Sequence, residues 1–450
     1  MRRILVLKRS RGPGSSRLAG GSVKGAKRVL FDATRLAMRG RINSPTGIDR
    51  VVLAYARWLV SRPDLDVVPV ATWGGKLMPL RPGCLPGLVA RAQAMSTASG
   101  VKNLKWLALR NALEMDSAPD WGLRPSPKPD KPDRKLAEGL ETVWLFLGGK
   151  LEPRAGDIYL NVSHSGLESP ELLAGLVEQG VAPVVMVHDL IPLTHPEFCV
   201  PNAEEKHEGR VRGLLKNAAL VLVNSSTTAE ELGRYASRRG LRQPPIEVAL
   251  LGLEEAFLSD RADRATRRPY FVTVGTIEAR KNLAFLLTAW RRLAEEMGPR
   301  APHLVLVGRR GWENEAVIDH LDRASAVRKL VHEITDLTDE QVAALIRGAR
   351  ALLAPSLAEG FDLPVIEALT LGAPVIASDI PVHRELARTA QLIDPLDGLG
   401  WIEAIQSACE HPPRRPRRPG YSWAEHFKIV AQALGLEADA PGPLRQVVNV

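Results

Sequence analysis

Short apolar runs rich in β-branched residues alternate with helix-patterned segments along most of this chain, and this alternation constrains the fold most strongly. It predicts an α/β protein with parallel sheets covered by helices. The first half contains candidate strands at residues 29–32, 67–71, 157–162, 183–187, 219–223 and 246–250. The second half contains candidate strands at residues 270–274, 303–307, 329–333, 351–354, 374–377 and 390–394. Each half therefore predicts one doubly wound sheet.

Segments without periodicity mark the expected domain boundaries. Residues 254–269 are charged and end in a proline, which predicts the connection between an N-terminal domain at 29–255 and a C-terminal domain at 269–410. Residues 117–135 are too rich in proline and charge for the interior of a helix or strand, and they predict a mobile loop in the first domain. Residues 421–436 have an amphipathic helical pattern and need a surface on which to dock.

The basic charge is concentrated at the start of the chain. The net charge is +9, and residues 1–28 carry nine Lys and Arg with no Asp or Glu, so the remainder is formally neutral. A neutral body argues against a nucleic-acid-binding protein. The basic tail predicts a disordered, solvated segment, with contact to an anionic membrane surface as the alternative.

Membrane insertion and export are both disfavoured by the sequence. No stretch reaches the roughly 18 apolar residues of a membrane span, and the first residues break off before a signal-peptide apolar region is complete. The three cysteines lie far apart, which indicates reduced thiols rather than disulfides or zinc knuckles. We therefore expect a cytoplasmic protein, with a peripheral position at the inner face of the cell membrane as the option that the tail allows.

Two carboxylates lie where a predicted strand end meets a helix. Glu359 is in the loop, and Glu367 comes eight positions later, in the helix that opens near Leu363. Gly360 permits close backbone approach, and the free amides of the helix start favour a nearby anion. Strand ends of α/β sheets bind ligands, and carboxylates accept hydrogen bonds from the hydroxyl pairs of a sugar or ribose. Taken alone, two solvated surface glutamates are the simpler interpretation.

A basic pair follows the first strand of the same half. Gly275 ends this strand, Arg280 and Lys281 lie in the next loop, and Asn282 begins the following helix. A guanidinium and an ammonium group here could bind the phosphates of a nucleotide and neutralise the charge on a departing diphosphate. A solvated basic turn is the alternative interpretation.

Together these segments resemble the family 4 glycosyltransferases of the GT-B type, the retaining, group 1 family that includes bacterial mannosyltransferases. The residues that match its signature of two glutamates separated by seven positions are Glu359, Gly360, Phe361, Pro364 and Glu367. The resemblance implies two Rossmann-like domains facing across a cleft, with the C-terminal helix crossing back to the first domain. It assigns Glu359 to the donor sugar, Glu367 to the ribose, and Lys281 with Arg280 to the diphosphate. Asp362 stands where the family usually has glycine or a small residue.

The resemblance extends to the first domain and completes the expected site. His188 lies in a segment that looks like the family's strand-end histidine segment, which reaches the donor sugar, although a histidine held by backbone contacts is the alternative. Gly47 matches the glycine at a helix start whose amides face the diphosphate. The expected catalytic residues are His188, Glu359, Lys281 and Arg280. The expected donor-binding residues are Gly47, Gly275, Gly360, Phe361, Leu363, Pro364 and Glu367.

The implied activity is transfer of a hexose from a nucleoside diphosphate sugar to a glycan or lipid-linked acceptor in surface polysaccharide synthesis. Mannose from GDP-mannose is the donor that the family favours. No metal is expected, because the aspartate pair Asp64 and Asp66 precedes a strand instead of ending one. Two alternatives stay open, namely a sugar-nucleotide epimerase of the same fold and a non-catalytic nucleotide-sugar-binding scaffold.

Overall fold

The computed structural model describes residues 27–39, 46–98, 104–115, 145, 148–259, 269–411 and 420–436. Two sequence-based expectations lie outside these residues. They are the basic tail at 1–28, apart from its last two residues, and the proline-rich loop at 117–135.

The first sheet has seven strands in the order β3-β2-β1-β4-β5-β6-β7. Its strands are β1 (Lys27–Asp32), β2 (Leu65–Trp73), β3 (Lys76–Pro79), β4 (Ile158–Asn161), β5 (Ala182–Val187), β6 (Leu220–Val223) and β7 (Ile246–Val248). All six strands expected in this half are confirmed, and their pairings are parallel. The seventh, β3, pairs antiparallel with β2 and was not expected.

The second sheet has six strands in the order β10-β9-β8-β11-β12-β13, and the pairings are parallel throughout. Its strands are β8 (Tyr270–Val274), β9 (His303–Val307), β10 (Val331–Ile334), β11 (Leu352–Ala354), β12 (Val375–Ser378) and β13 (Gln391–Ile393). All six were expected from the sequence. The chain starts at the central strand β8, adds β9 and β10 on one side, and then adds β11, β12 and β13 on the other, which is the doubly wound arrangement.

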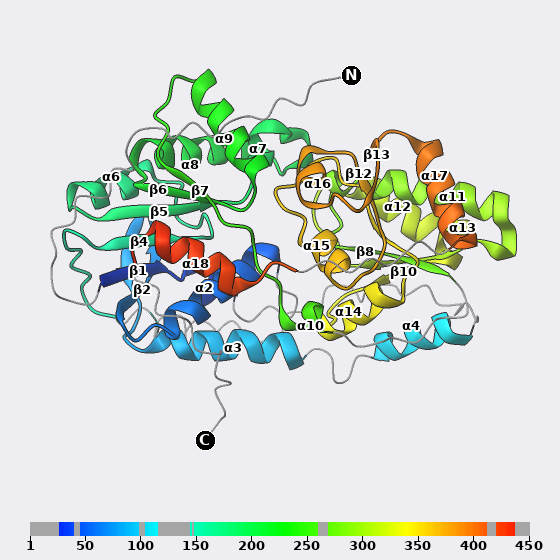
Figure 1. Ribbon diagram of the computed structural model, residues 1–450, viewed down its shortest axis with the longest axis horizontal. Coiled ribbons are helices and arrows are strands. Elements are labelled where there is room, and N and C mark those ends of the chain that lie inside the picture. The colour runs from blue at the N-terminus through cyan, green and yellow to red at the C-terminus, as the bar shows by residue number, and fades with distance from the viewer. Residues whose placement is uncertain are drawn as a thin grey trace, which may run out of the picture.

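Helices cover both faces of each sheet (Figure 1). Those that precede β8 are α1 (Thr34–Arg39), α2 (Gly47–Val60), α3 (Cys84–Ala98), α4 (Leu104–Met115), α6 (Pro170–Glu178), α7 (Ile191–Thr194), η1 (Pro196–Phe198), α8 (Ala203–Asn217), α9 (Ser226–Arg238) and α10 (Glu255–Leu258). Those that follow are η2 (Ala279–Lys281), α11 (Leu283–Met297), η3 (Gly298–Arg300), α12 (Glu315–Arg323), α13 (Ser325–Leu330), α14 (Asp339–Gly348), α15 (Leu363–Thr370), α16 (Pro381–Leu386), α17 (Gly398–Glu410) and α18 (Trp423–Ala433).

Alternate side chains of the central strands enter different apolar cores. In β1, Val29 and Phe31 pack into one core and Leu30 into another, and all three are fully buried. In β8, Tyr270 and Phe271 divide in the same way. Strands that are buried on both faces are typical of parallel sheets sandwiched between helices, so the alternating apolar pattern explains the layers.

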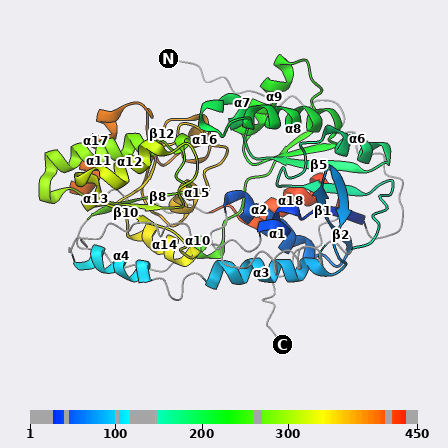
Figure 2. The ribbon, with the colours of Figure 1, turned by 180° about the vertical axis from the view of Figure 1, so that it is seen from behind.

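The C-terminal helix α18 packs on the first half of the chain, as the resemblance implied. Phe427 stacks on Trp58 of α2, with ring centroids 4.8 Å apart. His426 Nε2 lies 2.9 Å from the hydroxyl oxygen of Tyr55, which is also in α2. Both ribbon views place α18 beside α2 (Figures 1 and 2). The two doubly wound sheets and this returning helix confirm the expected GT-B architecture.

Candidate functional site

The loop after β8 brings two basic side chains to the carboxyl edge of the second sheet. Gly275 follows the strand with φ 143°, a conformation that favours glycine, and the chain then forms the short turn η2. A Cβ atom on Gly275 would lie 3.2 Å from Cε of Lys281, so a larger residue here would crowd the lysine. Arg280 donates a hydrogen bond of 3.1 Å to the carbonyl oxygen of Ala358, which ties this loop to the one after β11.

Glu359 lies between these two cations. Its Oε1 is 2.6 Å from Lys281 Nζ, and its Oε2 is 2.5 Å from Nη1 of Arg280. The glutamate side chain is 6% exposed and that of Lys281 is 9% exposed. Burial disfavours the carboxylate charge, but Arg280 and Lys281 outweigh this effect and hold the pKa of Glu359 below its usual value. The structure therefore brings together three residues that the sequence placed in one site.

Three further ionisable residues join this cluster, and sequence reasoning did not include them in the site. Glu278 forms an ion pair of 2.6 Å with Arg280. Asp362 lies 3.3 Å from Lys281 Nζ and 3.1 Å from Nε2 of His383. His383 lies in α16, the short helix that follows β12. Its position just after the carboxyl end of a strand was the signal that could have identified it.

Glu367 lies in the second turn of α15 and faces a different cation. Arg50 of helix α2 donates to its Oε1 at 2.9 Å and also contacts Asp339 at the start of α14. Burial raises the pKa of Glu367 to about 7, although Arg50 opposes this shift; Asp339 and Glu254 add to it. Glu359 and Glu367 thus belong to separate ion pairs, one within the second half of the chain and one that joins the two halves.

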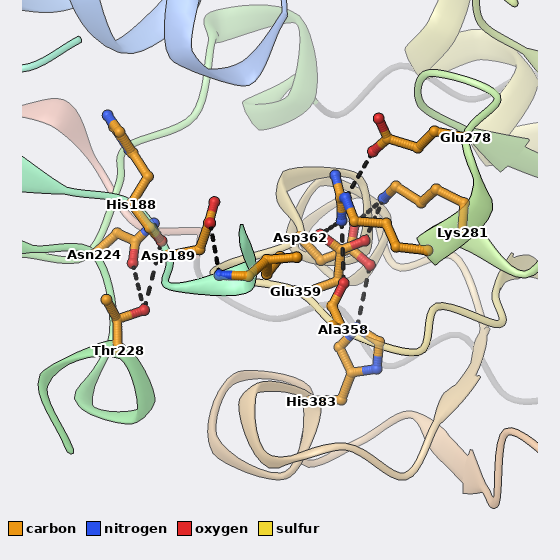
Figure 3. A network of polar contacts seen from close by, with 12 residues as sticks. His188, Asp189, Asn224, Thr228, Glu278, Lys281, Ala358, Glu359, Asp362 and His383 are labelled. Atoms are coloured by element: carbon orange, nitrogen blue, oxygen red, sulfur yellow. Dashed lines mark hydrogen bonds and ion pairs between the residues drawn. The ribbon is translucent and has the colours of Figure 1, made fainter. Parts of the chain in front are cut away.

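The loop that contains Glu359 lies directly against the first half of the chain. A Cβ atom on Gly360 would come within 2.1 Å of the carbonyl oxygen of His188, so this contact requires glycine. Ser225 donates a hydrogen bond of 3.0 Å to the carbonyl oxygen of Gly360. Figure 3 shows His188, Asn224 and their neighbours on one side of this contact and the group around Glu359 on the other. The strand-end loops of both sheets therefore meet at one place.

His188 follows β5 and is buried against the backbone of the first sheet. Its Nε2 lies 2.8 Å from the carbonyl oxygen of Val162, and its own carbonyl oxygen accepts a hydrogen bond of 2.9 Å from Asn224. Burial lowers the pKa of His188, so its ring is neutral near pH 7. This is the backbone contact that the sequence analysis kept as an alternative. The catalytic role of His188 stays a prediction.

The remaining expected residues surround the same loop. Gly47 begins helix α2, and a Cβ atom there would lie 3.5 Å from the side chain of Leu363. Leu363 and Pro364 form the first turn of α15, and Phe361 is buried with its ring 6.4 Å from that of Tyr421. These residues lie beside the loop of Glu359, and their roles in donor binding stay predictions.

The described part of the chain contains no group of three or more His, Cys, Asp or Glu residues arranged to hold a metal ion. The aspartate pair is divided: Asp64 lies in a turn and pairs with Arg62, and Asp66 lies in β2 with an oxygen 3.6 Å from Arg28. In the same described residues, no helix combines the length and apolar character that a membrane crossing requires.

The doubly wound pair of sheets and the strand-end site define the class of the chain as a GT-B-fold protein. The fold is shared with sucrose-phosphate synthase from Thermosynechococcus elongatus, with a TM-score of 0.54 and 17% identity over 91% of this chain and 96% of that chain. The family profile described as "Glycosyl transferases group 1" matches residues 255–421. The matched region is therefore similar to group 1 glycosyltransferases, and it contains Glu359, Glu367, Arg280 and Lys281.

Relatives with named activities include two Escherichia coli proteins. The serotype-specific mannosyltransferase WbdA is 29% identical over 45% of this chain and 26% of its own length. The O-antigen chain mannosyltransferase B is 29% identical over 50% of this chain and 59% of its own length. The chain therefore spans about a quarter of the first relative and less than two thirds of the second.

Proposed function

We propose that this chain is a hexosyltransferase that moves a hexose from a nucleoside diphosphate sugar to a glycan or lipid-linked acceptor. The observation that carries the proposal is the contact of Glu359 with Lys281 and Arg280 at the carboxyl edge of the second sheet. The loop that holds Glu359 also touches the first half of the chain at His188. A donor molecule bound at this loop would therefore contact the strand-end loops of both sheets.

Each charged group has a proposed role in donor binding. Lys281 and Arg280 bind the diphosphate, because both are cationic and largely buried. Glu359 accepts hydrogen bonds from hydroxyls of the donor sugar, and Glu367 accepts them from the ribose. Each carboxylate is paired with a cation in the structure, so these ion pairs must open or widen when donor hydroxyls bind.

The proposed reaction breaks the bond between the anomeric carbon and the diphosphate oxygen. The bonding electron pair leaves with the diphosphate oxygen, which gains negative charge; the acceptor hydroxyl oxygen forms the new bond to that carbon, and its proton passes to the departing diphosphate. Lys281 and Arg280 stabilise this charge, and the burial of Lys281 and Glu359 strengthens the effect. We propose that the anomeric configuration is retained and that no divalent ion is needed. Turnover should therefore survive a chelator, and a strict requirement for manganese would contradict this part.

Mannose from GDP-mannose is the proposed donor, and surface polysaccharide synthesis is the proposed setting. The support is that the relatives described above are named as mannosyltransferases, one of them acting on the O-antigen chain. The proposed acceptor is a growing glycan or a lipid-linked oligosaccharide. The basic residues at 1–28 would suit contact with the anionic surface of the cytoplasmic membrane.

The test is a thermal-shift screen of nucleotide sugars, followed by turnover assays with and without acceptor. A binding donor raises the apparent melting temperature, and GDP-mannose is expected to give the largest shift. Glycosylated product that forms only with acceptor present would support the transferase. Donor conversion without acceptor would indicate an epimerase instead. Absence of binding by every nucleotide sugar would overturn the proposal, whereas binding without any turnover would indicate a scaffold.

A further inference from the structure

Asp362 and His383 form a buried contact beside Lys281 that the proposed roles do not use. Asp362 precedes α15 with φ 60°, and its side chain is 2% exposed. Its Oδ1 lies 3.3 Å from Lys281 Nζ, and its Oδ2 lies 3.1 Å from Nε2 of His383. Asp362 therefore competes for the charge of Lys281, the residue proposed to bind the diphosphate.

Both ring nitrogens of His383 face oxygen acceptors. Nδ1 lies 2.8 Å from the carbonyl oxygen of Ser378, and Nε2 faces the carboxylate of Asp362. A backbone carbonyl and an ionised carboxylate accept hydrogen bonds but donate none, so a doubly protonated ring satisfies both contacts at once. Burial opposes this charge, but Asp362 outweighs burial and raises the pKa of His383.

The charges of the cluster balance when this ring is protonated. The carboxylates are Glu278, Glu359 and Asp362, and the permanently charged cations are Arg280 and Lys281. Buried charges are tolerated where they are paired, and an imidazolium supplies the missing cation. With a neutral histidine, an anionic diphosphate would enter a cluster that already carries one net negative charge.

We propose that Asp362 and His383 are positioning residues for the donor diphosphate: protonated His383 neutralises Asp362 and thereby leaves Lys281 available to the diphosphate. This inference rests on the proposed function, since it concerns the same donor site. When His383 loses its proton, Asp362 takes a larger share of Lys281 and the diphosphate binds more weakly. The contribution of this pair to donor affinity therefore falls as pH rises through the pKa of His383.

Three other charged groups surround the pair, namely Glu359, Arg280 and Lys281. Their pKa values are shifted away from neutrality, so these groups keep their charges between about pH 6 and about pH 8.5. Helix α9 packs against α16 and meets it at Thr227, whose amide binds Glu385. Glu367 has a pKa of about 7 in the same donor site, and Asp362 contributes to raising it. The comparison of wild type with His383→Gln, which keeps Asp362, therefore isolates the pH dependence that comes from His383.

Calorimetric titration of the full chain with GDP-mannose and UDP-glucose, between about pH 6 and about pH 8.5, tests the pair. His383→Gln keeps an N–H donor near Asp362 but has no charge, so it should weaken donor binding by about tenfold or more at the acidic end. The double variant Asp362→Asn with His383→Gln removes one charge of each sign and should recover most of this affinity. His320→Gln, on the exposed face of α12, is the matched control and should behave as wild type.

Two results would overturn the inference. One is a folded His383→Gln variant with wild-type affinity and pH dependence, and the other is a double variant that binds no better than His383→Gln alone. If wild type binds neither these two nucleotide sugars nor any other in the thermal-shift screen, the proposed function fails, and nitrogen-15 NMR of the imidazole then decides on the pair separately. We expect a doubly protonated His383 ring near pH 7 that becomes neutral in Asp362→Asn, and a neutral ring in wild type would contradict the proposal.

Discussion

The two glutamates of the signature segment differ in where their partners come from. Glu359 is held by Lys281 and Arg280, which lie in the turn after β8 of the same domain. Glu367 is held by Arg50, which comes from helix α2 on the other side of the molecule. The pKa values move in opposite directions, because two adjacent cations outweigh burial at Glu359 but one cation does not at Glu367.

This difference separates two parts of the donor site. The ion pairs of Glu359 are formed by loops of one domain, and the neighbouring Gly360 contacts the other domain only through its backbone. The group around Glu367 needs Arg50, so its geometry depends on how the domains approach one another. Substitutions in the first group should therefore act on the diphosphate and on the stability of one domain, and those in the second should act on donor binding through the contact between the domains.

Lys281→Ala should have the largest effect. It removes a buried cation and leaves the carboxylates of Glu359 and Asp362 with fewer partners. We expect the free energy of unfolding to fall by about 3–5 kcal/mol. The loss of charge stabilisation in the transition state should lower kcat/KM by about 100-fold or more. Urea unfolding and steady-state kinetics measure the two effects.

The control for this variant is Lys329→Ala, which removes a lysine from the last turn of α13 in the same domain. Surface substitutions of this kind change stability by about 0.5 kcal/mol or less. Activity of the Lys281→Ala variant within a few fold of wild type would remove Lys281 from the proposed mechanism.

Glu367→Gln should remove a pH dependence of stability that Glu359 does not share. The pKa of Glu367 is raised from 4.5 to about 7 in the folded chain, so the folded state holds the proton more tightly than the unfolded state. This contribution, about 3 kcal/mol, is fully present below pH 4.5 and is lost as pH rises through about 7. Urea unfolding at several pH values should therefore show a flatter profile for Glu367→Gln than for wild type. Parallel profiles would show that Glu367 does not titrate in this range.

Arg50→Gln should weaken donor binding without removing the charge around Glu359. The substitution leaves Glu367 and Asp339 without their shared cation, so the pKa of Glu367 should rise further and less of it should be ionised to accept ribose hydroxyls. We expect an increase in donor KM of about 5- to 20-fold, with a smaller change in kcat. Arg234→Gln, in helix α9 of the same domain, is the control because its pair with Glu230 is exposed and the two atoms lie 3.7 Å apart. A fall in kcat alone would place Arg50 in the chemical step instead.

The strands of both sheets were predictable because each is a short apolar run between polar loops, a pattern that needs no knowledge of distant residues. The hairpin strand β3 was not expected, since Lys76–Pro79 is short and only partly apolar. Its signal was the pair Gly74 and Gly75, which both have positive φ and join β2 to β3 as a two-residue turn.

The site was predictable only in part, because its partners come from distant segments of the chain. Lys281 and Glu359 both follow strands that lie side by side in the sheet, and their proximity follows from the strand-end rule. The contact of Arg50 with Glu367 joins residues 317 positions apart and depends on the packing of two domains. The contact of Asp362 with His383 depends on the αL conformation of Asp362, which the sequence signals only as a departure from the family's small residue.

Glu385→Gln should have the smallest effect, although Glu385 also joins the two domains. Its carboxylate accepts hydrogen bonds from the amides of Ser226 and Thr227 at the start of α9, at 2.7 and 2.8 Å. Helix α9 keeps its own cap, because Ser225 accepts from the amide of Thr228, and the glutamate is partly exposed. Loss of the charge should therefore cost about 0.5–1 kcal/mol of unfolding free energy, against a smaller change for Glu230→Gln on the exposed side of the same helix. A loss of unfolding free energy above about 2 kcal/mol would contradict this prediction and would show that Glu385 makes a strong contact between the domains.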